Sequence, residues 1–167
     1  DILRLMGADI LITNQRNVAG EPIADLKMSA CRLRGIDVPN TLVALAIDEF
    51  PILAIAAACA DGRTSITGVG ELRVKESDRI RSIVDGLRAL TIDVEETPDG
   101  MIITGGRFSG GKVDSCGDHR IAMAFALAGS VSRGPVRVMN CGLVQTSFPG
   151  FSDMARKAGL RLEVESS

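Results

Sequence analysis

The stretch that decides the fold is "DEFPILAIAAACADGRTSITGVG", residues 48–70, which has a counterpart in "DHRIAMAFALAGSVSRGPVRVMNCG", residues 118–142. Each stretch reads as a helix, a glycine-containing turn and a strand. The offset of about 70 residues between their starts indicates duplicated supersecondary units. A second pattern, the end of an amphipathic helix followed by a tight turn and an alternating strand, recurs in "LRLMGADILIT" (3–13), "LRALTIDVEET" (87–97) and "MARKAGLRLEVES" (154–166).

The hydrophobic pattern within these units predicts which elements are buried. The predicted helices 51–60 and 121–131 are apolar nearly all round and rich in alanine, so we expect them to be buried on every side. The predicted strands 92–96, 136–139 and 160–164 alternate between apolar and polar residues, so one face of each should contact water. A doubly wound fold shows the reverse pattern. The sequence therefore predicts an inside-out α/β arrangement, with helices buried and sheets outside.

Length and composition limit the class of protein. At 167 residues, with 46% hydrophobic and 24% charged residues, the chain fits one globular domain. A net charge of −2 and the lack of Trp and Tyr argue against nucleic-acid binding. The longest apolar run, "FPILAIAAACA" (50–60), is shorter than the roughly 18 residues of a membrane span, and we interpret it as a buried helix.

The four cysteines predict free thiols. They lie far apart in the sequence, without a C-x-x-C pair, at Cys31, Cys59, Cys116 and Cys141. With a single histidine in the chain, this spacing argues against a zinc site and favours a reducing cytoplasm. His119 itself is expected to be a hydrogen-bonding neighbour rather than a catalytic group. The first residues read like a helix end followed by a strand, so we expect the chain to begin inside a larger protein.

Charged residues cluster where three predicted helices begin. The first helix opens with Asp48-Glu49 and Pro51, the second with "ELRVKESDRI" (71–80), and the last with Asp118-His119-Arg120. Apolar spacing along the second helix places its start near Ser77. Unpaired N–H groups at helix starts attract anions. If related units pack about one axis, these starts converge, and arginines beside helix dipoles suit a ligand that carries phosphate and carboxylate.

Each of these residues also has a purely structural interpretation. Asp48 can be a helix N-cap, since Asp is a preferred capping residue. Glu76 and Asp78 can simply complement the helix dipole. Arg79 and Arg120 can form surface ion pairs, the commonest arrangement of an arginine. From the residues alone these alternatives stay open.

Four motifs carry a family resemblance. In this order and spacing, "IDEFPILAIAAA", "ELRVKESDRI", "GDHRIAMAFAL" and "TSFPGF" closely resemble the C-terminal half of the 3-phosphoshikimate 1-carboxyvinyltransferases. These are the EPSP synthases, the shikimate-pathway enzymes inhibited by glyphosate. The sequences of the four motifs are similar to those of the bacterial class II branch. The resemblance implies an inside-out α/β barrel of βαβαββ units, three in each of two domains. Residues 1–167 would form most of the C-terminal domain, about two to three units, without the N-terminal domain.

The resemblance also implies a reaction. The family transfers the enolpyruvyl group of phosphoenolpyruvate to the 5-hydroxyl of shikimate 3-phosphate and releases phosphate, with no metal or organic cofactor. By motif, Asp48 contacts the shikimate hydroxyls and accepts a proton, and Lys75 binds shikimate 3-phosphate. Glu76 protonates the methylene carbon of phosphoenolpyruvate, and Arg79 and Arg120 bind its anionic groups. The full-length enzyme is expected to be a cytoplasmic monomer.

One departure and two alternatives accompany this resemblance. Many family members carry a lysine where this chain has Thr146, so Thr146 is not included in the predicted site. UDP-N-acetylglucosamine enolpyruvyltransferases share the fold and the phosphoenolpyruvate chemistry but use other motifs. A fragment that binds phosphorylated ligands without turnover is the second alternative, because the resemblance places half of the active site on the absent N-terminal domain.

Overall fold

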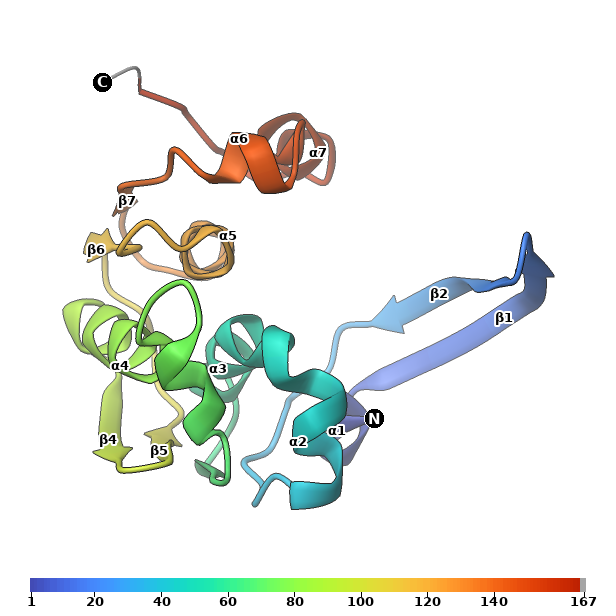
Figure 1. The fold of residues 1–167 in the computed structure, drawn as a ribbon, viewed down its shortest axis with the longest axis horizontal. Helices are drawn as coiled ribbons and strands as arrows, with labels where there is room; N and C mark the ends of the chain where they lie inside the picture. The colour runs from blue at the N-terminus through green and yellow to red at the C-terminus, as the bar shows by residue number, and fades with distance from the viewer. Residues whose placement is uncertain (166–167) are drawn as a thin grey trace.

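The computed structural model describes residues 1–165 of the chain (Figure 1). Its helices and short 3-10 helices (η) alternate with strands along the chain. In order, the elements are α1 (Ile2–Leu5), β1 (Asp9–Val18), β2 (Glu21–Ser29), α2 (Asn40–Ala46), η1 (Ile47–Glu49), α3 (Phe50–Ala58), β3 (Arg63–Ile66), η2 (Gly70–Val74), α4 (Arg79–Ala89), β4 (Asp93–Thr97), β5 (Gly100–Thr104), β6 (Gly111–Asp114), α5 (His119–Ala128), β7 (Val136–Met139), α6 (Val144–Ser147) and α7 (Phe151–Lys157).

The strands form three small sheets. An antiparallel hairpin joins β1 and β2, the antiparallel order β3-β5-β4 makes the second sheet, and β6 pairs in parallel with β7. Strand β5 is central and contains the apolar run Met101–Ile103, so it is more buried than the alternating strands β4 and β7. The alternation predicted for residues 92–96 and 136–139 is therefore confirmed.

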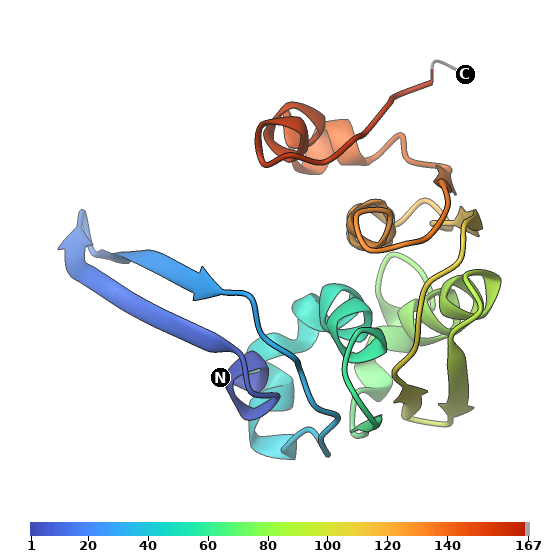
Figure 2. The same cartoon turned by 180° about the vertical axis from the view of Figure 1, so that it is seen from behind.

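The three longest helices lie together, with the β3-β5-β4 and β6-β7 sheets packed against them. Helices α3, α4 and α5 contact one another, and no residue of α3 or α5 is exposed (Figures 1 and 2). Gly86 of α4 faces the ring of Phe125 on α5, and a Cβ atom at Gly86 would lie only 2.3 Å from that ring. The glycine lets the C-terminal halves of the two helices approach closely, while the hydrogen bond from Arg79 to Asp118 joins their N-terminal ends. The predicted inside-out arrangement is confirmed.

One predicted strand is absent. Residues 160–164 are extended in sequence pattern but form no strand, and none of the sheets in the described chain pairs with them. A strand is stabilised by its hydrogen-bonded neighbour, so alternation alone does not produce one. The prediction of a strand at 160–164 is wrong for this chain. The predicted helices 51–60 and 121–131 begin and end earlier than expected, at 50–58 and 119–128.

The helical stretch Asn40–Ala58 is long and apolar enough to cross a membrane by length and composition. It is not one regular helix, because η1 interrupts it with Asp48 and Glu49, whose side chains form ion pairs. Its second half, α3, packs against α4 and α5 in the hydrophobic core. We therefore interpret this stretch as part of the core, as the sequence predicts for α3.

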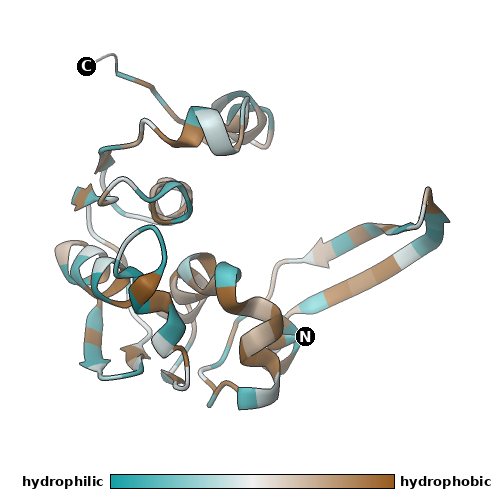
Figure 3. Cartoon of the chain, viewed as in Figure 1, coloured by the Kyte–Doolittle hydropathy of each residue, from teal (hydrophilic) through white to brown (hydrophobic). Residues whose placement is uncertain are grey.

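The β1–β2 hairpin extends away from the rest of the molecule (Figures 1 and 2). Its register places Ile10 opposite Met28 and Ile12 opposite Leu26, so these four side chains share one apolar face. The apolar residues at the base of β1 are visible in Figure 3. Leu26 and Met28 are 66% and 61% exposed, while Ile10 and Ile12 are half-buried, so much of this face contacts solvent.

Candidate functional site

Three segments that are distant in sequence meet at the N-terminal ends of the core helices. Turn η1 carries Asp48, the segment before α4 carries Lys75 and Glu76, and the starts of α4 and α5 carry Arg79 and Arg120. Ion pairs connect all five side chains directly or through a shared partner. The convergence that the helix starts predict is confirmed.

Arg79 lies at the centre of this cluster and is 1% exposed. Its Nε donates to Asp118 Oδ2 at 2.7 Å, its Nη1 to Asp48 Oδ1 at 2.9 Å and its Nη2 to Glu76 Oε2 at 2.6 Å. Burial alone would lower the pKa of the Arg79 guanidinium, but its hydrogen bonds and the charges of these carboxylates raise it. Arg79 therefore stays charged, and the surface ion-pair interpretation of this residue is wrong.

Asp118 is fully buried and is the N-cap of α5. Its Oδ1 accepts from the backbone N–H groups of Arg120 at 2.9 Å and Ile121 at 3.3 Å. Burial would raise the pKa of Asp118, but the hydrogen bond and charge of Arg79, with the two N–H groups, hold it below the ordinary value. The carboxylate is thus ionised and links the start of α5 to Arg79 on α4.

Lys75 and Arg120 stand at the periphery of the cluster. Lys75 Nζ lies 2.6 Å from Glu71 and 3.9 Å from Asp48, and its hydrogen bond to Glu71 is the main cause of its raised pKa. Arg120 Nη1 donates to the Asp48 carbonyl at 3.0 Å and to Glu49 Oε1 at 2.8 Å. Both side chains are partly exposed, so their cationic ends are accessible to an anionic ligand.

The structure decides between several of the interpretations left open above. Asp48 is not a helix cap, because it lies in η1 and its carboxylate accepts from Arg79 instead. Asp78 is the cap of α4 and accepts from the Arg81 backbone N–H at 3.0 Å. His119 makes no side-chain hydrogen bond with residues 1–165, contrary to expectation.

Sequence reasoning missed two residues that organise the site. Asp118 was noticed only as part of a charged helix start, although an Asp directly before an apolar helix is itself a capping signal. Arg73 on η2 donates to the carbonyls of Thr97 and Pro98 and forms an ion pair with Asp78. It fixes the segment before α4 to the β4–β5 turn. No local pattern around Arg73 indicates this long-range contact.

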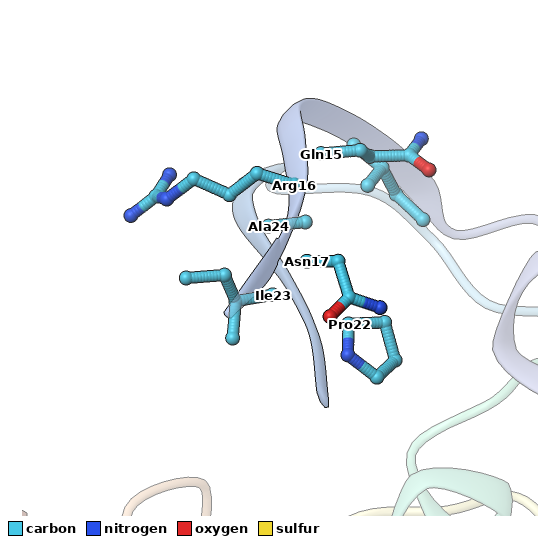
Figure 4. Close-up of a pocket in the computed structure, with 7 residues that line it drawn as sticks. Gln15, Arg16, Asn17, Pro22, Ile23 and Ala24 are labelled. Atoms are coloured by element: carbon cyan, nitrogen blue, oxygen red, sulfur yellow. The ribbon is translucent and has the colours of Figure 1, made fainter. Parts of the chain in front are cut away.

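Hollows on the surface lie elsewhere. One of about 360 Å³ at the tip of the hairpin is lined by Ile12, Gln15, Arg16, Asn17, Pro22, Ile23 and Ala24 (Figure 4). It is formed by the twist of two solvent-exposed strands and contains none of the clustered charges. The charged cluster lies outside this hollow, and its Asp48 and Glu76 side chains are about half exposed to solvent. Within residues 1–165, no group of three or more His, Cys, Asp or Glu is arranged to hold a metal ion.

Comparison with known proteins identifies the family. The sequence profile of EPSP synthase (3-phosphoshikimate 1-carboxyvinyltransferase) matches residues 1–154. This chain belongs to the EPSP synthase family. A 3-phosphoshikimate 1-carboxyvinyltransferase of Methylococcus capsulatus is 57% identical over 164 residues, and one of Acidithiobacillus ferrooxidans is 57% identical over 167 residues.

Solved structures agree with this assignment. EPSP synthase from Acinetobacter baumannii matches 99% of this chain with a TM-score of 0.95 and 49% sequence identity. The inside-out α/β fold is thus that of the EPSP synthase family. This chain covers 38% of the Methylococcus protein and 39% of the Acinetobacter chain, so it corresponds to about two fifths of these relatives.

Proposed function

We propose that this chain is part of an enzyme that transfers the enolpyruvyl group of phosphoenolpyruvate to the 5-hydroxyl of shikimate 3-phosphate. The observation that carries the proposal is the convergence of Asp48, Lys75, Glu76, Arg79 and Arg120 at the N-terminal ends of the three core helices. Cations and carboxylates together suit this reaction, since both substrates are anions and protons must be both removed and added. Family membership supports the same conclusion.

The roles proposed for the carboxylates follow from their exposure. Asp48 and Glu76 are about half exposed, so substrate can reach them, whereas Asp118 is fully buried. In the addition step, Asp48 accepts the proton of the 5-hydroxyl as its oxygen bonds to C2 of phosphoenolpyruvate, and Glu76 in its carboxyl form gives a proton to the methylene carbon. In the elimination step, the Glu76 carboxylate takes back a methyl proton as the C2–O bond to phosphate breaks, and the leaving phosphate takes the proton held by Asp48. Positioned acid–base groups contribute roughly 10²–10⁴-fold to such steps.

The cations hold the two substrates. We assign Lys75 to the phosphate of shikimate 3-phosphate, and Arg79 and Arg120 to phosphoenolpyruvate. Arginine presents a planar fork that matches a carboxylate, whereas lysine acts as a point charge. The mixture of both at one wall therefore suits two differently shaped anionic groups.

We further propose that residues 1–167 form most of the C-terminal domain, that the N-terminal domain supplies the facing wall, and that the full-length enzyme is a cytoplasmic monomer without metal or organic cofactor. The open cluster and the coverage of about two fifths of the relatives support a divided site. Holding two substrates in register contributes roughly 7–11 kcal/mol to the barrier reduction. The isolated chain should therefore bind phosphorylated ligands weakly and catalyse nothing.

Phosphate release tests these proposals. The full-length protein should release phosphate from phosphoenolpyruvate only when shikimate 3-phosphate is present, with the enolpyruvyl ether detected by NMR. UDP-N-acetylglucosamine serves as the competing acceptor, and turnover with it alone would overturn the assignment. Turnover by residues 1–167 alone would contradict the divided site, while recovery on adding a separately made N-terminal half would support it.

A further inference from the structure

The three carboxylates around Arg79 differ in how firmly they are held. Asp118 is 0% exposed, while Asp48 and Glu76 are 46% and 47% exposed. Water therefore reaches two partners of Arg79 but not the third. An ion pair shielded from water is stronger and exchanges less readily than one in contact with solvent.

Asp118 is also held by more donors than the other two. Its Oδ2 accepts from Arg79 Nε and from Ser77 Oγ, at 2.7 and 3.3 Å, while its Oδ1 receives the two backbone N–H groups of α5. Moving Asp118 would uncap α5 and leave a buried charge without a partner. Glu76, in contrast, accepts a side-chain hydrogen bond only from Arg79 among the described residues.

We propose that Asp118 is a positioning residue that fixes Arg79, and that Asp48 and Glu76 are exchangeable counterions displaced from it by a ligand carboxylate. The proposal rests on the proposed function, because that carboxylate belongs to phosphoenolpyruvate. Asp118 holds Nε, so the fork formed by Nη1 and Nη2 keeps its direction when the outer partners leave. A fork of this kind binds a carboxylate through two parallel hydrogen bonds.

The exchange has a chemical consequence. Before the ligand arrives, Arg79 neutralises Asp48 and Glu76, the two groups proposed to move protons. When the ligand carboxylate takes their place, both side chains are released toward the substrates while Arg79 stays paired. Arrival of phosphoenolpyruvate itself thus frees the proton-transferring groups.

Asp118→Asn separates positioning from capping. Asparagine caps a helix about as well as aspartate, so α5 should keep its cap, and any loss of stability should come from the buried ion pair with Arg79. The amide NH₂ would face the Arg79 Nε donor, and Arg79 should lose its orientation. In the full-length enzyme the KM for phosphoenolpyruvate should rise roughly tenfold to a hundredfold, typical of one charge-assisted hydrogen bond. The KM for shikimate 3-phosphate should stay within about twofold.

Asp78→Asn is the matched control, because Asp78 caps α4 but does not contact Arg79. It should leave the KM of both substrates within about twofold. An equal rise in both KM values for Asp118→Asn, or no rise in either, would overturn the positioning role.

Glu76→Gln tests whether Glu76 is displaced from Arg79. Its expected effect on phosphoenolpyruvate binding is opposite to that of Asp118→Asn. If Glu76 competes with the ligand for Arg79, removal of its charge should tighten phosphoenolpyruvate binding severalfold, measured by calorimetry with shikimate 3-phosphate present, while kcat falls. Unchanged or weaker binding would show that Glu76 is not a displaceable counterion.

An NMR measurement separates this proposal from the proposed function. In the substrate-free full-length protein labelled with ¹⁵N-arginine, the Arg79 Nε–H signal, assigned by its loss in Arg79→Lys, should exchange slowly with water. Asp118→Asn should abolish this protection and Glu76→Gln should keep it. Rapid exchange in the unmodified protein, or an equal loss of protection in both variants, would overturn the positioning role of Asp118 even if enolpyruvyl transfer is observed. Conversely, Asp118 can position Arg79 in a protein that lacks this activity.

Discussion

The hairpin and the charged cluster place side chains in opposite environments. On the hairpin, Leu26 and Met28 are apolar and mostly exposed, whereas Arg79 and Asp118 in the cluster are charged and almost completely buried. The buried charges are tolerated because each one is paired and hydrogen-bonded within the chain. The exposed apolar side chains of the hairpin remain largely in contact with solvent. The difference shows that this chain buries charge only where the charged groups are paired, but leaves apolar side chains of the hairpin exposed.

The largest effect is expected from removal of the Arg79 side chain, the cation at the centre of the cluster. Arg79→Ala leaves Asp118 buried without its ion-pair partner, and breaking a buried pair costs about 3–5 kcal/mol. In the full-length protein, we expect the free energy of unfolding to fall by this amount and the proposed enolpyruvyl transfer to be lost. Arg79→Lys should restore part of the stability but little activity, because a point charge does not replace a bidentate fork. Wild-type kinetics for Arg79→Lys would contradict the central role of this side chain.

Asp48→Asn should affect chemistry more than stability. The carboxylate is about half exposed and does not cap α3, so the loss of its charge should change the free energy of unfolding by less than about 1 kcal/mol. If Asp48 accepts the hydroxyl proton, kcat should fall roughly 10²–10⁴-fold. Thermal unfolding and steady-state kinetics on the same preparation check both parts. A variant that loses stability yet keeps its turnover would contradict the assignment.

Arg120→Ala should weaken one substrate selectively. Arg120 pairs with Glu49 at the accessible edge of the cluster, and the loss of one charge-assisted contact costs about 1.5–3 kcal/mol. We expect that loss in phosphoenolpyruvate binding, with little change for shikimate 3-phosphate. Calorimetric titration of each substrate is the appropriate measurement. Equal weakening of both would argue that Arg120 shapes the cluster rather than binding phosphoenolpyruvate.

The core helices and the clustering of charged residues at their starts were predictable from the sequence. The apolar helices at 50–58 and 119–128 were recognised because alanine-rich segments without a polar face belong inside a protein. Charged residues at the starts of these two helices and of α4 predicted the convergence of Asp48, Arg79 and Arg120. Each of these signals is local, which is why sequence reasoning detects it.

The parts that failed depend on partners distant in the sequence. The segment 160–164 alternates like a strand, but no neighbouring strand pairs with it among residues 1–165. Asp48 has the residue type of a cap, yet η1 turns its side chain toward Arg79. The role of Asp118 depends on a contact with a residue 39 positions away. Such pairings are set by packing, which hydrophobic periodicity does not specify.

Acid pH should reduce the stability that the buried Asp118 carboxylate contributes. The pKa of Asp118 is lower in the folded chain than the ordinary value of about 3.9, so its stabilising effect is fully present above that value. The effect is lost as the pH falls through the lower folded pKa. The stability difference between the unmodified chain and Asp118→Asn should therefore be largest near neutral pH and shrink below about pH 4. Urea unfolding at a series of pH values measures it, and a difference that grows toward acid would contradict the ion pair.

The smallest effect is expected on the hairpin. In the chain 1–167, Leu26→Ala removes a side chain that is 66% exposed, and substitutions at such positions usually change stability by at most about 0.5 kcal/mol. Ile83→Ala on α4 is the buried comparison and should cost about 2–5 kcal/mol, because Ile83 is 0% exposed. Urea unfolding of both variants at two protein concentrations checks the pair. A loss for Leu26→Ala close to that of Ile83→Ala would show that the hairpin face is covered in solution. If that loss also grew with protein concentration, the cover would be a second copy of the chain, because intramolecular packing does not depend on concentration.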